Sequence, residues 1–189
     1  MLNRCVLFAA LALAACQSAQ KPPLDGAKIG GPFALQSGAG RTVTDKDFAG
    51  QFRIVYFGYT NCPDVCPTDM ANLGRGTAAF RKANPSAPPV ALIFITVDPA
   101  RDTPVVADKF AKALLPDAVG LSGSQPAIDG VKKAFAVYGK AQAGASPGSY
   151  LVDHSRTSYL MDRDGKPMAI LPSEQSAEAV TKDLERWIK

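Results

Sequence analysis

The sequence predicts an α/β fold in which a central mixed sheet lies between layers of helices. Two continuous apolar runs, RIVYFGY at 53–59 and VALIFITV at 90–97, are typical of strands buried on both faces. A helical pattern separates the two runs, and strands joined through a helix pair in parallel. Later segments alternate around a turn, which predicts antiparallel strands at one edge. We therefore expect three layers and one domain.

The first half of the domain begins with a predicted hairpin extension at 33–48, where weak alternation surrounds the glycine-rich SGAG. After the first buried strand, Pro67 suits the first turn of a helix because its missing N–H would be unpaired there. Gly74 and Gly76 would each weaken that helix by about 1 kcal/mol relative to alanine. Its buried face is predicted to hold Met70, Leu73, Thr77 and Phe80.

A second helix is predicted to start at Thr103 and Pro104, an N-cap residue followed by proline at the first helical position. Its buried stripe would be Val106, Phe110, Ala113 and Leu114. Residues 119–123 read as a short third strand. The stripe of the following helix would be Ile128, Val131, Phe135 and Tyr138.

The C-terminal part is predicted to hold a loop at 139–149, extended segments at 150–152 and 157–161, and a returning strand at 168–171. Ser173 is the predicted N-cap of a final helix. The buried face of that helix would be Val180, Leu184, Trp187 and Ile188.

The N-terminus predicts export. Residues 1–15 have the charged start and short apolar core of a signal peptide, and LAAC at 13–16 resembles the bacterial lipobox. Lipidation of Cys16 would anchor the protein at a membrane, on the extracytoplasmic, periplasmic face. Soluble secretion after cleavage within 12–14 is the alternative. Residues 16–32 would then be the lipidated cysteine and a flexible tether, and 33–189 the folded domain.

The composition excludes some functions. Hydrophobic residues make up 47% and charged residues 20%, as in ordinary globular proteins. The net charge is +4, and the sequence has neither basic runs nor aromatic residues interleaved with them. We therefore expect no nucleic-acid partner.

Cys62 and Cys66 stand four apart, just beyond the first buried strand and near a helix start that favours the thiolate. One helical turn places their Cα atoms about 6 Å apart, so they can form a disulfide or converge on one metal ion. The spacing leaves both possibilities open, together with a redox pair. A purely structural disulfide would stabilise little, because so short a loop loses little entropy on closure. Ligands of such sheets gather beyond the carboxyl ends of parallel strands, where Asp98 also falls.

His154 is the only histidine in the sequence. A lone histidine is more often a surface or core residue than a ligand, but two thiolates and one imidazole suit Cu(I), which tolerates three-coordination. Zinc would require a fourth ligand. Asp153 would point to the opposite face of an extended strand. The glycines in 139–149 suggest that His154 is an adjustable arm, too far from the sulfurs until metal binds.

Three motifs together resemble the Sco/SenC family: CPDVCP at 62–67, VDP followed by RDTP within 97–104, and VDH at 152–154. The resemblance implies a thioredoxin-like fold and copper, as Cu(I) or Cu(II), bound by Cys62, Cys66 and His154. It also implies a role in maturing the dinuclear copper centre of cytochrome c oxidase. The partners would be the copper-centre subunit and other periplasmic copper chaperones. Many members have a transmembrane anchor, whereas this chain has the lipobox.

Two functions from different classes remain. The first is a copper metallochaperone, which is not an enzyme in the strict sense; its ligands could be supported by Asp98 and Asp153. Asp98 could equally serve only to turn the chain, and Arg101 and Asp102 are expected to cap a helix or form a surface ion pair. The second is a thiol–disulfide oxidoreductase that keeps target cysteines reduced, with Cys62 and Cys66 as its redox pair. A peroxidase is a weaker third possibility. A requirement for His154 separates the first two.

Overall fold

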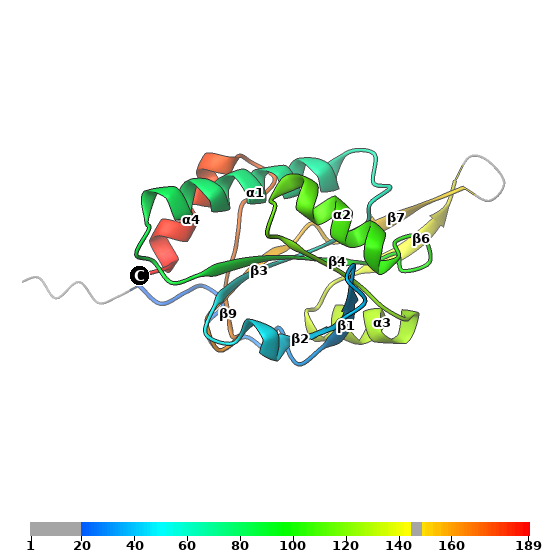
Figure 1. Cartoon of the computed structure of the whole chain (residues 1–189), viewed down its shortest axis with the longest axis horizontal. Helices are drawn as coiled ribbons and strands as arrows, with labels where there is room; N and C mark the ends of the chain where they lie inside the picture. The colour runs from blue at the N-terminus through cyan, green and yellow to red at the C-terminus, as the bar shows by residue number, and fades with distance from the viewer. Residues whose placement is uncertain (1–19, 145–148) are drawn as a thin grey trace, which may run out of the picture.

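The protein is described here by a computed structural model that covers residues 20–144 and 149–189. The predicted signal peptide, the lipobox with Cys16 and residues 145–148 of the predicted loop lie outside the described residues. The described part confirms the expected α/β architecture: a mixed sheet between two layers of helices (Figure 1).

The centre of the fold is a sheet whose described strands run in the order β2-β1-β5-β4-β3-β8-β9. The central three pair in parallel, as predicted, and their bounds are Phe52–Gly58 (β3), Val90–Thr96 (β4) and Val119–Ser122 (β5). The predicted N-terminal hairpin pairs antiparallel with β5 through Ala34–Ser37 (β1), which is joined to Thr42–Thr44 (β2). The other edge is the antiparallel pair Ser158–Met161 (β8) and Pro167–Ile170 (β9).

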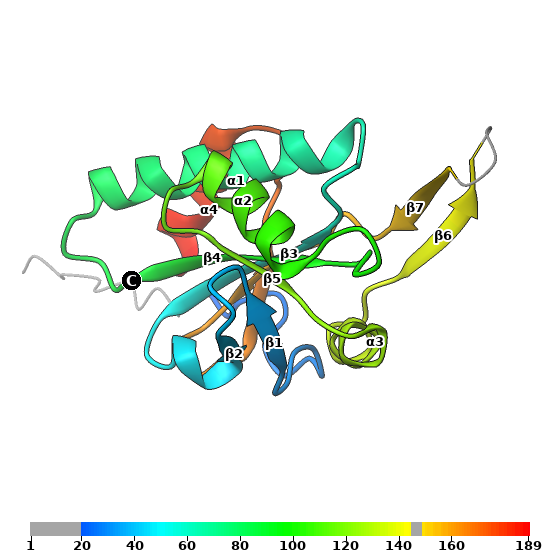
Figure 2. The same ribbon diagram turned by 45° about the vertical axis from the view of Figure 1, so that its right-hand side comes forward.

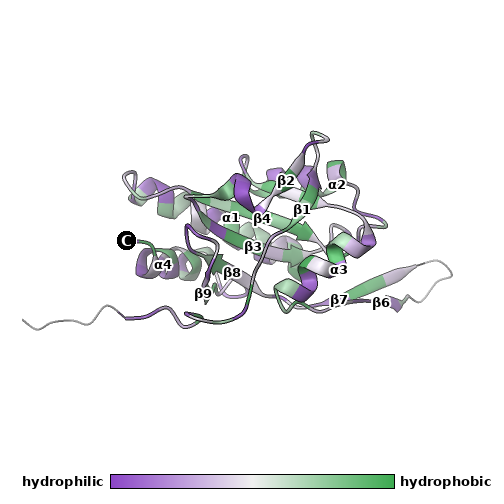
Figure 3. Cartoon of the chain, turned by 90° about the horizontal axis from the view of Figure 1, so that it is seen from below, coloured by the Kyte–Doolittle hydropathy of each residue, from purple (hydrophilic) through white to green (hydrophobic). Residues whose placement is uncertain are grey.

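The helices cover both faces of this sheet. One face carries Val65–Ala83 (α1), Pro104–Leu114 (α2) and Ala177–Trp187 (α4), and the other carries Gln125–Ala134 (α3) (Figures 1 and 2). A short 3-10 helix, Asp45–Phe48 (η1), follows β2. The central strands β3 and β4 are coloured hydrophobic along most of their length, whereas α4 alternates between hydrophilic and hydrophobic residues (Figure 3). The core therefore lies between the sheet and the inner sides of the helices.

The structure corrects the predicted loop at 139–149. Gly139–Ala143 is a strand (β6) that pairs antiparallel with Tyr150–His154 (β7), and the two form a separate sheet within the described residues. This hairpin extends away from the rest of the molecule (Figure 2). The missed strand β6 is exposed along nearly its whole length, so the sequence there lacks the apolar alternation that marks a half-buried strand.

Some predicted helix faces and ends were also wrong. In α2 the buried residues are Ala107 and Ala111, whereas Val106 and Ala113 are exposed, because the helix packs with its small residues against β5. Tyr138 is 53% exposed because α3 ends at Ala134. The N-cap of α4 is Ser176, whose side chain accepts a hydrogen bond from the Ala179 N–H. The predicted cap, Ser173, is buried, and its hydroxyl hydrogen-bonds that of Ser158.

Part of the predicted tether is attached to the domain. The backbone N–H of Leu24 donates to the Met168 carbonyl and that of Gly30 to the Ala134 carbonyl, both at 2.9 Å. Leu24 and Ile29 also pack against the core. In residues 20–144 and 149–189, no helix is both long enough and apolar enough to cross a membrane.

Candidate metal centre

The turn between β3 and α1 carries two cysteines. After β3 ends at Gly58, the Cys62 N–H donates to the Tyr59 carbonyl at 3.2 Å, which reverses the chain. Because α1 begins at Val65, Cys66 lies in its first turn, and its N–H donates to Cys62 Sγ at 3.4 Å. Both side chains are buried, at 7% and 0% exposure, and both are free thiols. The predicted disulfide between them stays a prediction.

His154 completes the cluster from a distant part of the sequence. It is the last residue of β7, and a three-residue link joins it to β8, which pairs with β3 so that Ser158 lies opposite Tyr56. The link therefore returns beside the end of β3, and His154 Nε2 lies 3.1 Å from Cys66 Sγ. The ligand atoms of Cys62, Cys66 and His154 all lie within 4.8 Å of one another.

This geometry corrects the expectation of an adjustable arm that stays away from the sulfurs. In the structure the imidazole is already in contact with Cys66. Its ring stands edge-on to Tyr56 and Tyr59, with centroids 6.5 and 5.7 Å away and interplanar angles of 89°. Such edge-to-face contacts are a favourable arrangement for aromatic rings.

The tautomer of His154 follows from its second nitrogen. Nδ1 lies 2.9 Å from the Ser155 carbonyl oxygen, which can only accept, so Nδ1 carries the proton. Nε2 then presents its lone pair to Cys66, and a neutral imidazole with this orientation is the usual metal-binding form. Burial lowers the pKa of His154 and so favours the neutral ring. The hydrogen bond to Ser155 acts in the opposite direction but does not outweigh burial.

The two thiols are in different environments. Burial opposes ionisation of Cys62, but hydrogen bonds from the backbone N–H groups of Asp64, Cys66 and Val65 outweigh it and lower the pKa of this thiol. Burial raises the pKa of Cys66 to about 12, with a further contribution from Cys62. At neutral pH Cys66 therefore keeps its proton, and its S–H points to the lone pair of His154 Nε2.

The donor set fits one soft metal ion. Bonds of about 2.3 Å to sulfur and about 2.0 Å to nitrogen, as at zinc sites, place three donors about 3.5–4 Å apart around a common ion. The separations here start at 3.1 Å and do not exceed 4.8 Å. Two thiolates and one imidazole are the donors that Cu(I) prefers. The described residues contain no other cluster of three such side chains.

The structure places the two predicted supporting carboxylates differently. Asp153 is exposed and accepts a hydrogen bond from Gln142, so it points away from the cluster, as predicted. Asp98 is buried, pairs with Arg101, and accepts a hydrogen bond from the Tyr150 hydroxyl at 2.8 Å. Arg101 also stacks on the Tyr150 ring, 3.6 Å from its centroid. Asp98 therefore fastens the start of β7 to the end of β4.

The prediction for Asp102 was wrong. Its side chain is fully buried, and it accepts hydrogen bonds from the N–H and hydroxyl of Thr60 at 2.9 and 2.6 Å. It accepts a third from the Thr96 hydroxyl at 2.7 Å. Asp102 thus holds the chain that leads to Cys62 against the end of β4.

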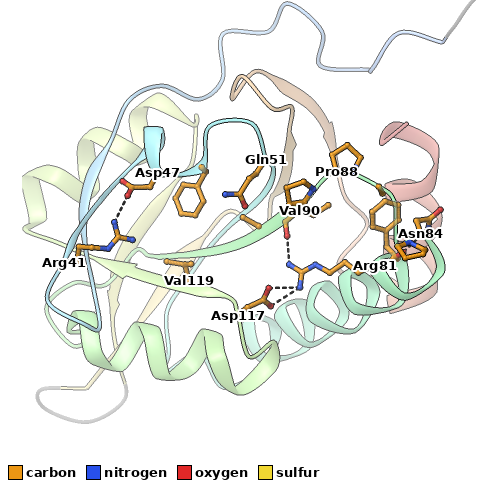
Figure 4. Close-up of a pocket in the computed structure, with 15 residues that line it drawn as sticks. Arg41, Asp47, Gln51, Arg81, Asn84, Pro88, Val90, Asp117 and Val119 are labelled. Atoms are coloured by element: carbon orange, nitrogen blue, oxygen red, sulfur yellow. Dashed lines mark hydrogen bonds and ion pairs between the residues drawn. The ribbon is translucent and has the colours of Figure 1, made fainter.

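A cavity of about 560 Å³ lies away from this site, where α1 ends and β4 begins (Figure 4). Its arginines have partners: Arg81 pairs with Asp117 at 2.8 Å and Arg41 with Asp47 at 2.5 Å. Arg81 also donates to the Val90 carbonyl. The cavity contains none of the three ligands.

Three further residues next to the cluster were not singled out from the sequence. Asp69, in α1, is fully buried and binds both the Tyr56 hydroxyl and the Arg156 guanidinium. A signal for Asp69 existed, because it stands three residues after Cys66 and next to Met70 on the predicted buried face. A carboxylate in that position requires a partner.

The fold resembles solved thioredoxin-like structures. The thioredoxin domain of a thiol-disulfide oxidoreductase from Bacteroides vulgatus matches with a TM-score of 0.58 at 15% sequence identity, over 85% of this chain and 96% of that chain. At this identity the likeness concerns the fold alone. The predicted thioredoxin-like architecture is confirmed.

Closer relatives define the family. The family model described as SCO1/SenC matches residues 21–189. Protein SenC of Rhodobacter capsulatus is 44% identical over 136 residues, which span 72% of this chain but only 60% of that protein. The structure of Bradyrhizobium japonicum ScoI with copper bound matches with a TM-score of 0.74 and 38% identity, over 84% of this chain and 99% of that chain. The chain therefore belongs to the SCO1/SenC family.

Proposed function

We propose that this protein is a copper metallochaperone for the dinuclear copper centre of cytochrome c oxidase. The observation that carries the proposal is the convergence of Cys62, Cys66 and His154, which come from two distant segments, within 4.8 Å. A relative of 38% identity has been solved with copper bound, which supports copper as the ion. Copper is the cargo here, taken up from a periplasmic donor and passed to the copper-centre subunit.

The site is prepared for uptake in two respects. The imidazole is neutral and presents Nε2, so it needs no deprotonation. The Cys66 thiol must lose its proton, which leaves for solvent as the ion binds. We further propose that lipidated Cys16 holds the protein at the periplasmic membrane face, where the oxidase subunit would also be reached.

A second candidate is a thiol–disulfide oxidoreductase, favoured by the lowered pKa of Cys62 beside a second thiol. The Cys62 thiolate would attack one sulfur of a target disulfide and form a mixed disulfide with it, and the other target sulfur would leave as a thiolate. Cys66 would then attack Cys62 Sγ, after losing its proton, and release the second target thiolate. The target gains two electrons and becomes a dithiol, while Cys62 and Cys66 become a disulfide.

Anaerobic Cu(I) titration of the reduced protein, in competition with a chromophoric chelator, tests the proposal. We expect one copper ion per chain. His154→Ala should weaken affinity by more than the about 10- to 100-fold typical of residues that only support a ligand. It should also change the thiolate absorption of the Cu(II) form. Asp153→Asn is the matched control, because Asp153 is next to His154 in the sequence but its side chain points away from the cluster. This variant should bind copper as the wild type does. Unchanged affinity and spectrum in His154→Ala would favour the reductase.

A further inference from the structure

A buried ion pair runs beside the candidate metal centre. The Asp69 carboxylate, 0% exposed, accepts Arg156 Nη2 on Oδ1 at 2.8 Å and Arg156 Nε on Oδ2 at 3.1 Å. Its Oδ2 also accepts the Tyr56 hydroxyl at 3.0 Å. The carboxylate is thus bound by a two-pronged guanidinium and a phenol, a geometry that fixes direction as well as distance.

The ion pair joins the same two segments as the ligands do. Asp69 stands three residues after Cys66 on α1, and Arg156 stands two residues after His154. Residues three apart on a helix are neighbours, so Cys66 and Asp69 lie on the same side of α1, and each contacts a residue near the end of β7. The Cys66–His154 contact and the Asp69–Arg156 pair are therefore two parallel bridges between α1 and the link that follows β7.

The hairpin that ends at His154 does not hold the imidazole in place by itself. β6 and β7 pair with each other outside the main sheet, and most of their residues are exposed. Two residues after His154, the partly exposed Arg156 side chain pairs with the buried carboxylate of Asp69. The Ser155 N–H ties the link back to the hairpin through the Tyr138 carbonyl, whereas Arg156 ties it to α1 through Asp69.

We propose that Asp69 and Arg156 are positioning residues that hold His154 Nε2 against Cys66. Tyr56 connects the pair to the imidazole, since its hydroxyl binds Asp69 and its ring meets the His154 ring edge-on. A buried ion pair is weak evidence for stability, because apolar side chains of similar size often stabilise as well. The role we assign to this ion pair is to fix the position of His154, a candidate metal ligand. The inference rests on the proposed function, since it assigns these residues to the same site.

The test uses the single histidine of the chain. In the reduced, metal-free protein, the imidazole carbon-bound proton signals of His154 can be observed in the NMR spectrum without interference from another histidine. In the wild type, the neighbouring tyrosine rings should shift these signals away from free-histidine values. Arg156→Gln should move them toward those values, because the link is released. Arg156→Lys keeps the positive charge but cannot donate from two nitrogens to the two Asp69 oxygens. Its His154 signals should lie between those of the wild type and those of Arg156→Gln.

Copper affinity is the second measurement. Arg156→Gln should weaken Cu(I) binding by about 10- to 100-fold, and Arg156→Lys by less. Asp69→Asn should weaken Cu(I) binding about as much as Arg156→Gln does. If Asp69→Asn does not fold, the two Arg156 variants still decide, because the Arg156 side chain is 42% exposed and Arg156→Lys keeps a cation beside the buried Asp69 carboxylate.

Two control variants separate position from stability. Asp117→Asn removes another arginine–aspartate pair, in which Arg81 Nη1 alone donates to both oxygens of Asp117; Arg81 lies far along α1 from the site. Val180→Ala removes buried volume where α4 meets α1. Both should leave the His154 signals and copper affinity unchanged, although Val180→Ala lowers the melting temperature. The inference is wrong if the Arg156 and Asp69 variants behave like these controls. If the wild type binds no copper, the proposed function fails, while the metal-free NMR comparison still decides the positioning role.

Discussion

The two thiols of the site differ in how readily they lose a proton. Backbone N–H groups at the start of α1 stabilise the Cys62 thiolate enough to lower its pKa against the effect of burial. Cys66 has no exposed surface, and burial raises its pKa to about 12. One side chain is thus prepared to react and the other to remain protonated until a metal ion or a disulfide partner replaces its proton.

This difference predicts the order of alkylation. Iodoacetamide reacts with the thiolate, whose fraction at a given pH rises as the pKa falls. At pH 7 to 8 the reduced protein should be modified at Cys62 first, and Cys66 should remain largely unmodified in folded protein until far higher pH. Peptide mass spectrometry over time measures both sites. In urea the two rates should become similar, and faster labelling of Cys66 in the folded protein would contradict the assignment.

The three residues of the candidate metal centre could be singled out from the sequence, but most of the side chains that contact them could not. Cys62, Cys66 and His154 belong to residue types whose chemistry is known before the fold is. The roles of Asp69 and Asp102 depend on which side chains meet them from 87 and 42 residues away. The sequence shows a carboxylate next to an apolar helix face at Asp69 and one in a polar turn at Asp102, and for that reason Asp102 was wrongly expected to cap a helix or form a surface ion pair.

At the level of elements, the glycines of α1 have a packing role. A Cβ on Gly74 would lie 2.5 Å from the Leu114 carbonyl oxygen, and a Cβ on Gly76 would lie 2.7 Å from the Val180 side chain. Their missing side chains allow α1 to lie close to the end of α2 and to α4. Helix propensity alone predicts only that both glycines weaken the helix, and it does not predict this close contact.

We predict that Gly76→Ala destabilises the protein although alanine favours helix. Overpacking of this kind costs about 1–3 kcal/mol, which exceeds the gain of about 1 kcal/mol in propensity. Gly130→Ala in α3 is the matched control, because no atom lies within 4 Å of its added Cβ. It should stabilise by about 0.5–1 kcal/mol. Denaturant unfolding measures both, and a stabilised Gly76→Ala variant would contradict the packing argument.

Elements were predictable where burial gives a strong signal. The continuous apolar runs of β3 and β4 are typical of strands in the middle of a parallel sheet, which are buried on both faces. The strand β6, with the sequence GKAQA, has mostly exposed residues, and pairing with β7 defines it instead of burial. Local pattern therefore cannot separate it from a loop, which explains the error at 139–149.

On the scale of the whole molecule, the metal centre lies between a firm part and a loose part. The cysteines follow β3, which is buried along its whole length and paired on both sides. His154 ends the exposed β6–β7 hairpin, which is tied at two places. At its base the Ser155 N–H donates to the Tyr138 carbonyl at 3.1 Å, and at the far end of the β6–β7 pairing Arg101 Nη1 donates to the Tyr150 carbonyl at 2.9 Å.

Hydrogen exchange should show this division. An isolated two-stranded hairpin is marginally stable in water, so the amides of 139–143 and 150–153 should exchange through local opening. Those of β4, between two parallel neighbours, should require nearly global unfolding and exchange orders of magnitude more slowly. Copper should slow exchange in the hairpin, because a bound ion fixes His154 to the cysteines, and leave β4 unchanged. Exchange measured by mass spectrometry with and without Cu(I) tests both statements. Equal protection of hairpin and β4 would contradict the division. If the division holds, opening of the hairpin gives a route by which one ligand leaves first while the two sulfurs retain the ion for transfer.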